Sequence, residues 1–199
     1  AMCGLLRDSL EEGGVGTSTG LIYPPCIYAE QAELVALART TARAGGFWVV
    51  HLRNEGDHCL EGLQEMLDLA RETGCPLHIS HFKVTGKPNF DKAGRQVEMI
   101  LQAIRDGLQV TCDQYPYTAG STVLSAALPP WAHAGGPRET LARLRDPAER
   151  TRMRAEMEAP GPSSWAGQVR AAGYDGIVIA TVGSRQNQDA VGKSIAELA

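Results

Sequence analysis

Strand-like and helix-like segments alternate along the first half of this chain, and that alternation constrains the fold more than any other feature. Short apolar runs rich in β-branched residues recur about every thirty residues, which is the length of one strand–helix–strand unit. The expected strands are Val15 to Ile22, Phe47 to Val50, Pro76 to Ser80 and Leu108 to Asp113. Because parallel strands need a long crossover between them, the pattern predicts a parallel sheet in an α/β fold.

The segments between these strands have apolar residues at helical spacing and end at glycine, which stops helices. The expected helices are Ala29 to Ala44, Cys59 to Arg71 and a segment centred on Val97 to Ile104, after a first helix over Met2 to Glu12. About four strand–helix units are half of the eight that close a TIM barrel. The sequence therefore predicts a partial TIM-like (β/α) barrel.

The regular alternation stops after Tyr117. Residues 118–173 combine clusters of proline, glycine and tryptophan with a charged, helix-forming stretch, and they are expected to form a small, mostly helical insert. The apolar run Gly176 to Val182 predicts one more strand, and Ser194 is expected to cap a following helix. The predicted organisation is barrel units over residues 1–117, the insert over 118–173, and a return to the barrel strand and the start of the next helix over 174–199.

Charge and composition exclude several classes of function. The net charge of −4 lacks the basic excess of a nucleic-acid-binding surface. No apolar run approaches the roughly 20 residues needed to cross a membrane, and the acidic first residues do not resemble a secretory signal. Five cysteines without a CxxC pair are typical of a reduced protein, so a cytoplasmic location is expected.

Two histidines close successive strands: His51 ends the run FWVVH, and His81 ends PLHISH. Neighbouring parallel strands place their C-terminal ends side by side, at the face where α/β enzymes keep their chemistry. Two neutral imidazoles there suit zinc. The alternative is a pair of strand-end histidines that only form local hydrogen bonds. His78 has an odd offset from His81 along the strand, so it is expected to face the other way and to be structural.

Other polar side chains near the histidines are candidates for binding a substrate. Lys83 follows His81 by two residues, and a cation beside a metal needs an anion between them, which a substrate carboxylate would supply. Tyr115 and Tyr117 in DQYPY carry phenol groups that can donate to a carboxylate, and Tyr23 lies at the end of the first strand. A solvent-facing lysine and packing tyrosines are the alternatives.

The segment just beyond His51 is rich in charge. Arg53, Glu55 and Asp57 follow the strand within six residues of His51. They either orient the metal ligands or, for the two acids, occupy the N-terminal end of the next helix, where the helix dipole favours negative charge. The residues alone leave both interpretations open.

Four motifs occur in order along the chain: STGLIYPP (18–25), HLRNEGD (51–57), HISHFKVTGKPNF (78–90) and DQYPYTAGST (113–122). In this combination they resemble the N-acyl-D-amino-acid deacylase (D-aminoacylase) family of the amidohydrolase superfamily, and the resemblance extends to LPPWA and GKSIAELA. The resemblance implies a TIM-like barrel with a small β-sandwich. It also implies a catalytic zinc that hydrolyses the amide of N-acyl-D-amino acids.

The resemblance assigns roles to particular residues. His51 and His81 match two histidine ligands of the family's metal. Tyr23, Lys83 and Tyr115 match the family's contacts to the substrate carboxylate. Zinc is therefore the implied cofactor, and a small N-acyl-D-amino acid is the implied substrate.

The chain departs from the family at both ends. The family's HxH pair and its metal-binding cysteine precede the region that matches, and its catalytic aspartate follows the position of Ala199. The chain is therefore expected to be a central fragment of a zinc-dependent amidohydrolase, with the general base beyond residue 199 and little or no turnover of its own. The insert over residues 118–173 matches a segment that lies over the family's active site.

Two other classes stay open. One is a dihydroorotase- or hydantoinase-like cyclic amidohydrolase, which characteristically bridges two metals with a carbamylated lysine. Lys83 is the only strand-end lysine that fits such a role, and its place two residues beyond His81 fits a carboxylate contact better. The other class is a non-catalytic half-barrel that self-associates into a homo-oligomer through its exposed sheet edges.

Overall fold

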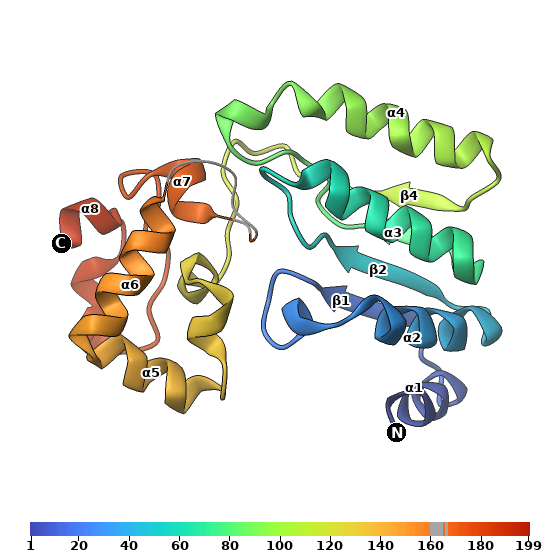
Figure 1. Cartoon of the computed structure of the whole chain (residues 1–199), viewed down its shortest axis with the longest axis horizontal. Helices are drawn as coiled ribbons and strands as arrows, with labels where there is room; N and C mark the ends of the chain where they lie inside the picture. The colour runs from blue at the N-terminus through green and yellow to red at the C-terminus, as the bar shows by residue number, and fades with distance from the viewer. Residues whose placement is uncertain (160–164, 166) are drawn as a thin grey trace. The chain divides into compact units, whose positions relative to one another are not determined.

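The computed structural model describes residues 1–159, 165 and 167–199, which divide into two compact units (Figure 1). The first unit comprises Ala1–Val123 together with Trp165. The second comprises the described residues of Leu124–Gly161 and Gly167–Ala199. The candidate site lies within the first unit.

The first unit is built on a four-stranded sheet with the strand order β1-β2-β3-β4. All three neighbouring pairs are parallel, and in the register Val49 lies beside His78, which lies beside Thr111. The strands are β1 (Gly16–Gly20), β2 (Phe47–His51), β3 (Leu77–Ile79) and β4 (Val110–Cys112). A parallel sheet in sequential order is half of a (β/α) barrel wall, so the predicted α/β fold and partial barrel are confirmed.

Helices connect the strands in the predicted order. They are α1 (Met2–Glu11), α2 (Gln31–Arg43), α3 (Cys59–Thr73) and α4 (Lys92–Arg105), with short 3-10 turns η1 (Cys26–Tyr28) and η2 (Lys87–Asn89). Gly74 ends α3 in the left-handed region at φ 69°, which is the usual place for glycine after a helix. Across the described parts of both units, no helix combines the length and the apolar content that a bilayer crossing requires.

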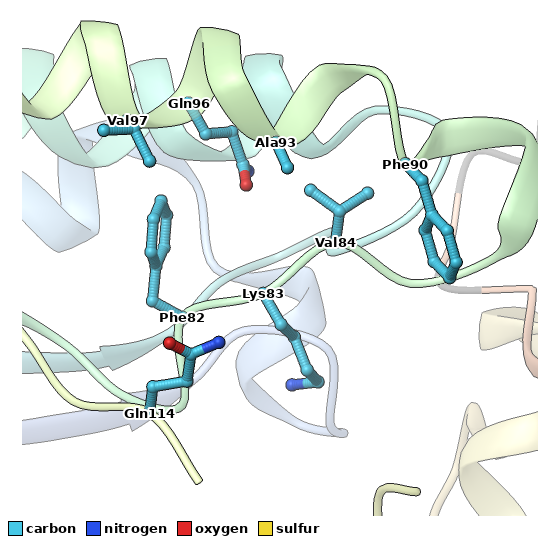
Figure 2. Close-up of a pocket in the computed structure, with 8 residues that line it drawn as sticks. All are labelled: Phe82, Lys83, Val84, Phe90, Ala93, Gln96, Val97 and Gln114. Atoms are coloured by element: carbon cyan, nitrogen blue, oxygen red, sulfur yellow. The ribbon is translucent and has the colours of Figure 1, made fainter. Parts of the chain in front are cut away.

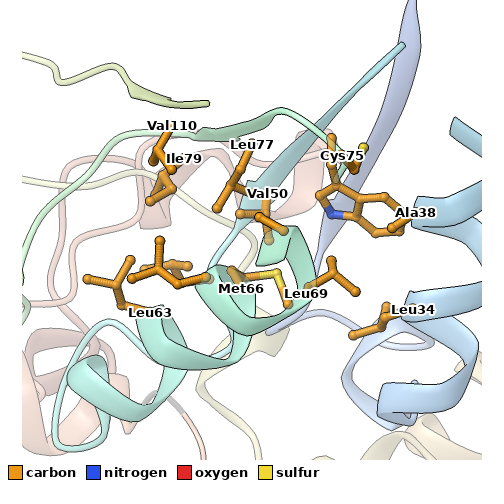
Figure 3. Packing of buried hydrophobic residues seen from close by; sticks show 14 of the residues in the cluster. Leu34, Ala38, Val50, Leu63, Met66, Leu69, Cys75, Leu77, Ile79 and Val110 are labelled. Atoms are coloured by element: carbon orange, nitrogen blue, oxygen red, sulfur yellow. The ribbon is translucent and has the colours of Figure 1, made fainter. Parts of the chain in front are cut away.

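The core of the first unit lies between one face of the sheet and the helices. Alternate residues of β2 and β3 point into it, and Figure 3 shows strand and helix side chains meeting there. Trp48 is fully buried, and its indole N–H donates to Thr19 Oγ1 at 3.1 Å. The buried partners are Val50, Leu77, Ile79 and Val110 from the strands, and Leu34, Leu63 and Met66 from the helices. By the same alternation, Phe47 and His51 of β2 lie on the opposite face.

The thiols follow the same division between core and surface. Cys59 and Cys75 are buried, whereas Cys112 is exposed on the edge strand β4. Burial raises the pKa of the Cys59 and Cys75 thiols above the usual value, so less of each is in the reactive thiolate form at pH 8. We expect iodoacetamide to label Cys112 first, and to label the two buried thiols only after unfolding in urea. Peptide mass spectrometry of a time course measures this, and equal labelling rates for Cys75 and Cys112 would contradict the burial pattern.

The second unit is small and mostly helical, and it includes residues 174–199, which were predicted to return to the barrel. Its elements are η3 (Leu124–Ala127), η4 (Pro130–His133), α5 (Pro137–Arg145), α6 (Pro147–Glu158), α7 (Gln168–Ala172), η5 (Arg185–Ala190) and α8 (Ile195–Leu198). Asp146 separates α5 from α6 and caps α6, because its carboxylate accepts from the Ala148 and Glu149 backbone N–H groups. The unit begins at Leu124, whereas the insert was predicted to begin at Thr118. Part of the insert, residues 160–164 and 166, lies outside the described residues.

The strand predicted over Gly176 to Val182 is not formed. Within that run only Val178 pairs, in an isolated antiparallel bridge with Ser194. The run has high β-propensity, but a strand also needs a partner with a free edge, and tertiary context overrides propensity. The predicted cap is confirmed: Ser194 and Glu197 form a reciprocal capping box at the start of α8.

Candidate metal centre

The two strand-end histidines converge in the first unit. His51 closes β2 and His81 follows the end of β3, and His51 Nδ1 lies 2.6 Å from His81 Nε2. The two rings meet edge to face, with centroids 4.3 Å apart. Glu55 completes the group: ligand atoms of His51, Glu55 and His81 all lie within 4.8 Å of one another. The convergence expected from the spacing of the two strands is therefore present.

His81 reaches this position through a turn rather than through a longer strand. β3 ends at Ile79, and His81 has φ 41°, in the left-handed region that non-glycine residues rarely adopt. Asp113 holds the turn: its Oδ1 accepts from the His81 backbone N–H at 2.6 Å, and its Oδ2 lies 2.9 Å from His78 Nε2. The hydrogen bond from His78, and then the one from the His81 backbone, lowers the pKa of the Asp113 carboxyl. Thr111 Oγ1 lies 2.8 Å from the other ring nitrogen of His78, so both ring nitrogens of this histidine have side-chain partners within the protein.

Glu55 brings a carboxylate between the histidines and Lys83. Its Oε1 is 3.0 Å from His81 Nδ1 and 3.8 Å from His51 Nδ1, and its Oε2 is 2.6 Å from Lys83 Nζ. Its side chain is only 11% exposed. The sequence offered Glu55 only as one acid among several after β2. Nothing in the motif separated it from Asp57, whose side chain accepts from Asn89 instead.

The other predicted site residues surround the histidine pair. The Tyr23 ring lies 5.2 Å from the His51 ring, and the Tyr115 ring lies 6.4 Å from the His81 ring. Lys83 Nζ lies 5.5 Å from the centre of the Tyr115 ring. Tyr23, Lys83 and Tyr115 thus come from three different loops to one place, beyond the C-terminal ends of the strands.

Lys83 points away from its apolar neighbours on the same loop. Figure 2 shows Phe82 and Val84 directed toward α4, and Lys83 directed to the opposite side. The apolar side chains line a hollow of about 310 Å³ that Ala93 and Val97 of α4 also border. The loop therefore has one apolar face that packs toward a helix and one charged face at the histidines.

Arg53 ties the loop after β2 to the loop that carries Tyr23. Its guanidinium forms a two-pronged ion pair with Glu65 of α3, at 2.9 to 3.1 Å. The same group donates to the backbone carbonyls of Ile27 at 2.8 Å and Ala29 at 3.1 Å. A planar guanidinium can make all these contacts at once, so Arg53 has a positioning role rather than a direct one.

The donor set fits a transition-metal ion such as zinc. Burial, together with the neighbouring His81 and Lys83 charges, lowers the pKa of His51 to about 3, so this imidazole is neutral near pH 7. Its Nε2 is buried and has no hydrogen-bond partner in the part of the chain that the structure describes. Imidazole nitrogens and carboxylate oxygens are ligand types that zinc binds, and an imidazole must be neutral to bind a metal, as His51 is.

Comparison with known proteins finds deacylases that are similar to this chain. The chain is 38% identical over 124 residues to the D-aminoacylase of Alcaligenes xylosoxydans xylosoxydans, and 44% identical over 124 residues to the N-acyl-D-glutamate deacylase of the same organism. Each match covers 62% of this chain. The resemblance predicted from the four motifs is confirmed. No family model matches the chain.

A solved structure supports the same resemblance to the deacylases. The N-acyl-D-glutamate deacylase from Bordetella bronchiseptica, in complex with zinc and a phosphonate that mimics the tetrahedral intermediate, aligns with a TM-score of 0.61 at 36% identity. The alignment covers 67% of this chain and 27% of that protein. The chain spans only 25% of the length of the two curated deacylases above.

Proposed function

We propose that this chain forms part of the site of a zinc-dependent amidohydrolase that hydrolyses N-acyl-D-amino acids to a D-amino acid and a carboxylate. The observation that carries the proposal is the approach of His51 Nδ1 to His81 Nε2 at 2.6 Å beside the Glu55 carboxylate. Support comes from relatives that are 38% and 44% identical and are named D-aminoacylase and N-acyl-D-glutamate deacylase.

The metal would be held by His51 and His81, with Glu55 beside them. When bound there, zinc supplies a Lewis acid that polarises an amide carbonyl. The chain's own contribution is to keep the His51 imidazole neutral, to bring it together with His81, and to keep the cation of Lys83 paired so that it does not repel a metal.

Lys83, Tyr23 and Tyr115 would bind the carboxylate of the substrate. Lys83 has three N–H donors, of which one reaches Glu55 and another the His81 carbonyl at 3.3 Å, so one is left for a substrate. A carboxylate held on this side fixes how the acylated nitrogen lies relative to the metal, and so which enantiomer is aligned for reaction. The general base is not among these residues, and we expect the 199-residue chain by itself to have little or no turnover.

Binding measurements test the proposal without requiring turnover. Calorimetry of the zinc-loaded chain with N-acetyl-D-glutamate and its L enantiomer should show tighter binding of the D form. Lys83→Met should weaken D binding by about 10-fold or more, because it removes a charge-assisted contact. Lys87→Met is the matched control, since Lys87 is exposed in the same loop, and it should bind like the wild type. Equal binding of both enantiomers, or stronger binding of a 5-substituted hydantoin, would contradict the proposal.

A further inference from the structure

We infer that Glu55 is a positioning residue for both the metal ligand His81 and the substrate contact Lys83. Its carboxylate orients His81 so that Nε2 faces the metal, and it holds Lys83 where the substrate carboxylate would bind. The inference rests on the proposed function for the roles of His81 as a metal ligand and Lys83 as a substrate contact. The contacts of Glu55 with both residues are observed in the structure.

The contacts of Glu55 decide which nitrogen of His81 carries the proton. Glu55 Oε1 lies 3.0 Å from His81 Nδ1, and a carboxylate can only accept, so Nδ1 must be the N–H. Lys83 Nζ also lies 3.2 Å from Nδ1, but an ammonium can only donate, so these two contacts exclude each other as hydrogen bonds. Lys83 has a shorter, charged partner in Glu55 Oε2 at 2.6 Å. We therefore assign the proton to Nδ1, which leaves the lone pair on Nε2, the atom that faces His51.

The charge of Lys83 is compensated within the protein. A cation beside a metal site needs an anion between them, and a substrate carboxylate was expected in that place from the sequence. Glu55 already lies there, with one oxygen on Lys83 and the other on His81. The protein's own carboxylate therefore screens the metal site from Lys83 before any substrate binds.

Hydrogen bonds of the backbone hold the loop that carries Glu55. Asn54 Oδ1 accepts from the backbone N–H of Gly56 at 2.8 Å and of His58 at 3.2 Å, which curls the loop back toward β2. The Glu55 carbonyl accepts from the Thr85 N–H at 2.6 Å, so the loops after β2 and β3 are joined at this residue. A carboxylate on such a braced loop is pre-positioned, as an outer partner of a metal ligand must be.

Three variants test the inference in the 199-residue chain. Glu55→Leu removes both charge and acceptor, and Glu55→Gln removes the charge but keeps an acceptor oxygen. Glu65→Gln is the matched control, because Glu65 is also a partly buried, ion-paired carboxylate, but its partner is Arg53 and not a histidine. Circular dichroism checks that each variant folds, and Glu55→Gln is the fallback if Glu55→Leu does not.

Two readouts are needed. In metal-free protein labelled with ¹⁵N-histidine, His81 should be the Nδ1–H tautomer in the wild type and in Glu65→Gln, and a mixture in Glu55→Leu. In zinc competition against a chromophoric chelator, Glu55→Leu should bind about 10- to 100-fold more weakly than the wild type, with a smaller loss for Glu55→Gln. Glu65→Gln should retain wild-type affinity.

The outcomes separate this inference from the proposed function. An Nε2–H tautomer in the wild type, or unchanged tautomer and zinc affinity in Glu55→Leu, would overturn the role of Glu55 while leaving a zinc site intact. A wild-type chain that binds no zinc, but whose His81 tautomer changes in Glu55→Leu, would support the positioning role and count against the zinc proposal for this chain.

Discussion

The double variant His51→Ala/His81→Ala is expected to lose zinc binding, by at least about 100-fold in affinity. Changing an outer partner of a metal ligand already costs about 10- to 100-fold, and this variant removes two direct ligands. Glu55 would remain as a single carboxylate, which does not hold zinc by itself. Metal analysis after dialysis should give near one zinc per wild-type chain and almost none for the variant.

The matched control removes two other histidines. His58 pairs with Glu61 near the start of α3, and His133 lies 3.1 Å from the Ser125 carbonyl in the second unit. His58→Ala/His133→Ala should therefore keep its zinc. Neither His51 nor His81 belongs to the hydrophobic core cluster, so the site variant should fold like the wild type by circular dichroism. Retention of zinc in the site variant would show that the metal binds elsewhere and would remove the main support for the amidohydrolase proposal.

The parts of this site that sequence reasoning found are those that depend on the order of strands. His51 and His81 could be paired because neighbouring parallel strands end at one edge of a sheet, whatever the loops do. The helices could be placed because their apolar spacing is a local property of each segment. The first argument needs only the position of each histidine at the end of its own strand and the rule for neighbouring parallel strands. The second needs only the pattern within one segment, and both agree with the structure.

The parts that it missed depend on contacts between distant segments. Glu55 faces the histidines because its loop is bonded to Thr85, some thirty residues further on, and no local pattern contains that bond. His81 turns at φ 41° because the Asp113 carboxylate receives its backbone N–H. Lys83 was expected to lie on the same side as His81 because a strand that continued past His81 would place residues two apart on one side. The strand ends at Ile79, and the turn brings Lys83 there instead.

Replacing Trp48 by alanine is expected to cost about 3 to 5 kcal/mol of unfolding free energy, which is a large share of the stability of a unit this size. Trp48 is fully buried in the middle of the core, and its indole N–H has a partner in Thr19. Truncation loses both the apolar burial and the filled volume, and it leaves the Thr19 hydroxyl without that donor. Urea unfolding should show the midpoint lowered by roughly 1 to 3 M with an unchanged slope.

Phe47 provides the matched comparison, because it is the adjacent residue on the same strand and points to the other face. It is 40% exposed, so Phe47→Ala should cost only about 1 kcal/mol or less. The contrast between two neighbouring aromatic residues tests the central feature of this half-barrel: the core lies on the face of the sheet that carries Trp48, and Phe47 points to the other face. Similar losses for both variants would mean that Phe47 is also covered in solution, which is the result expected if the chain associates through that residue.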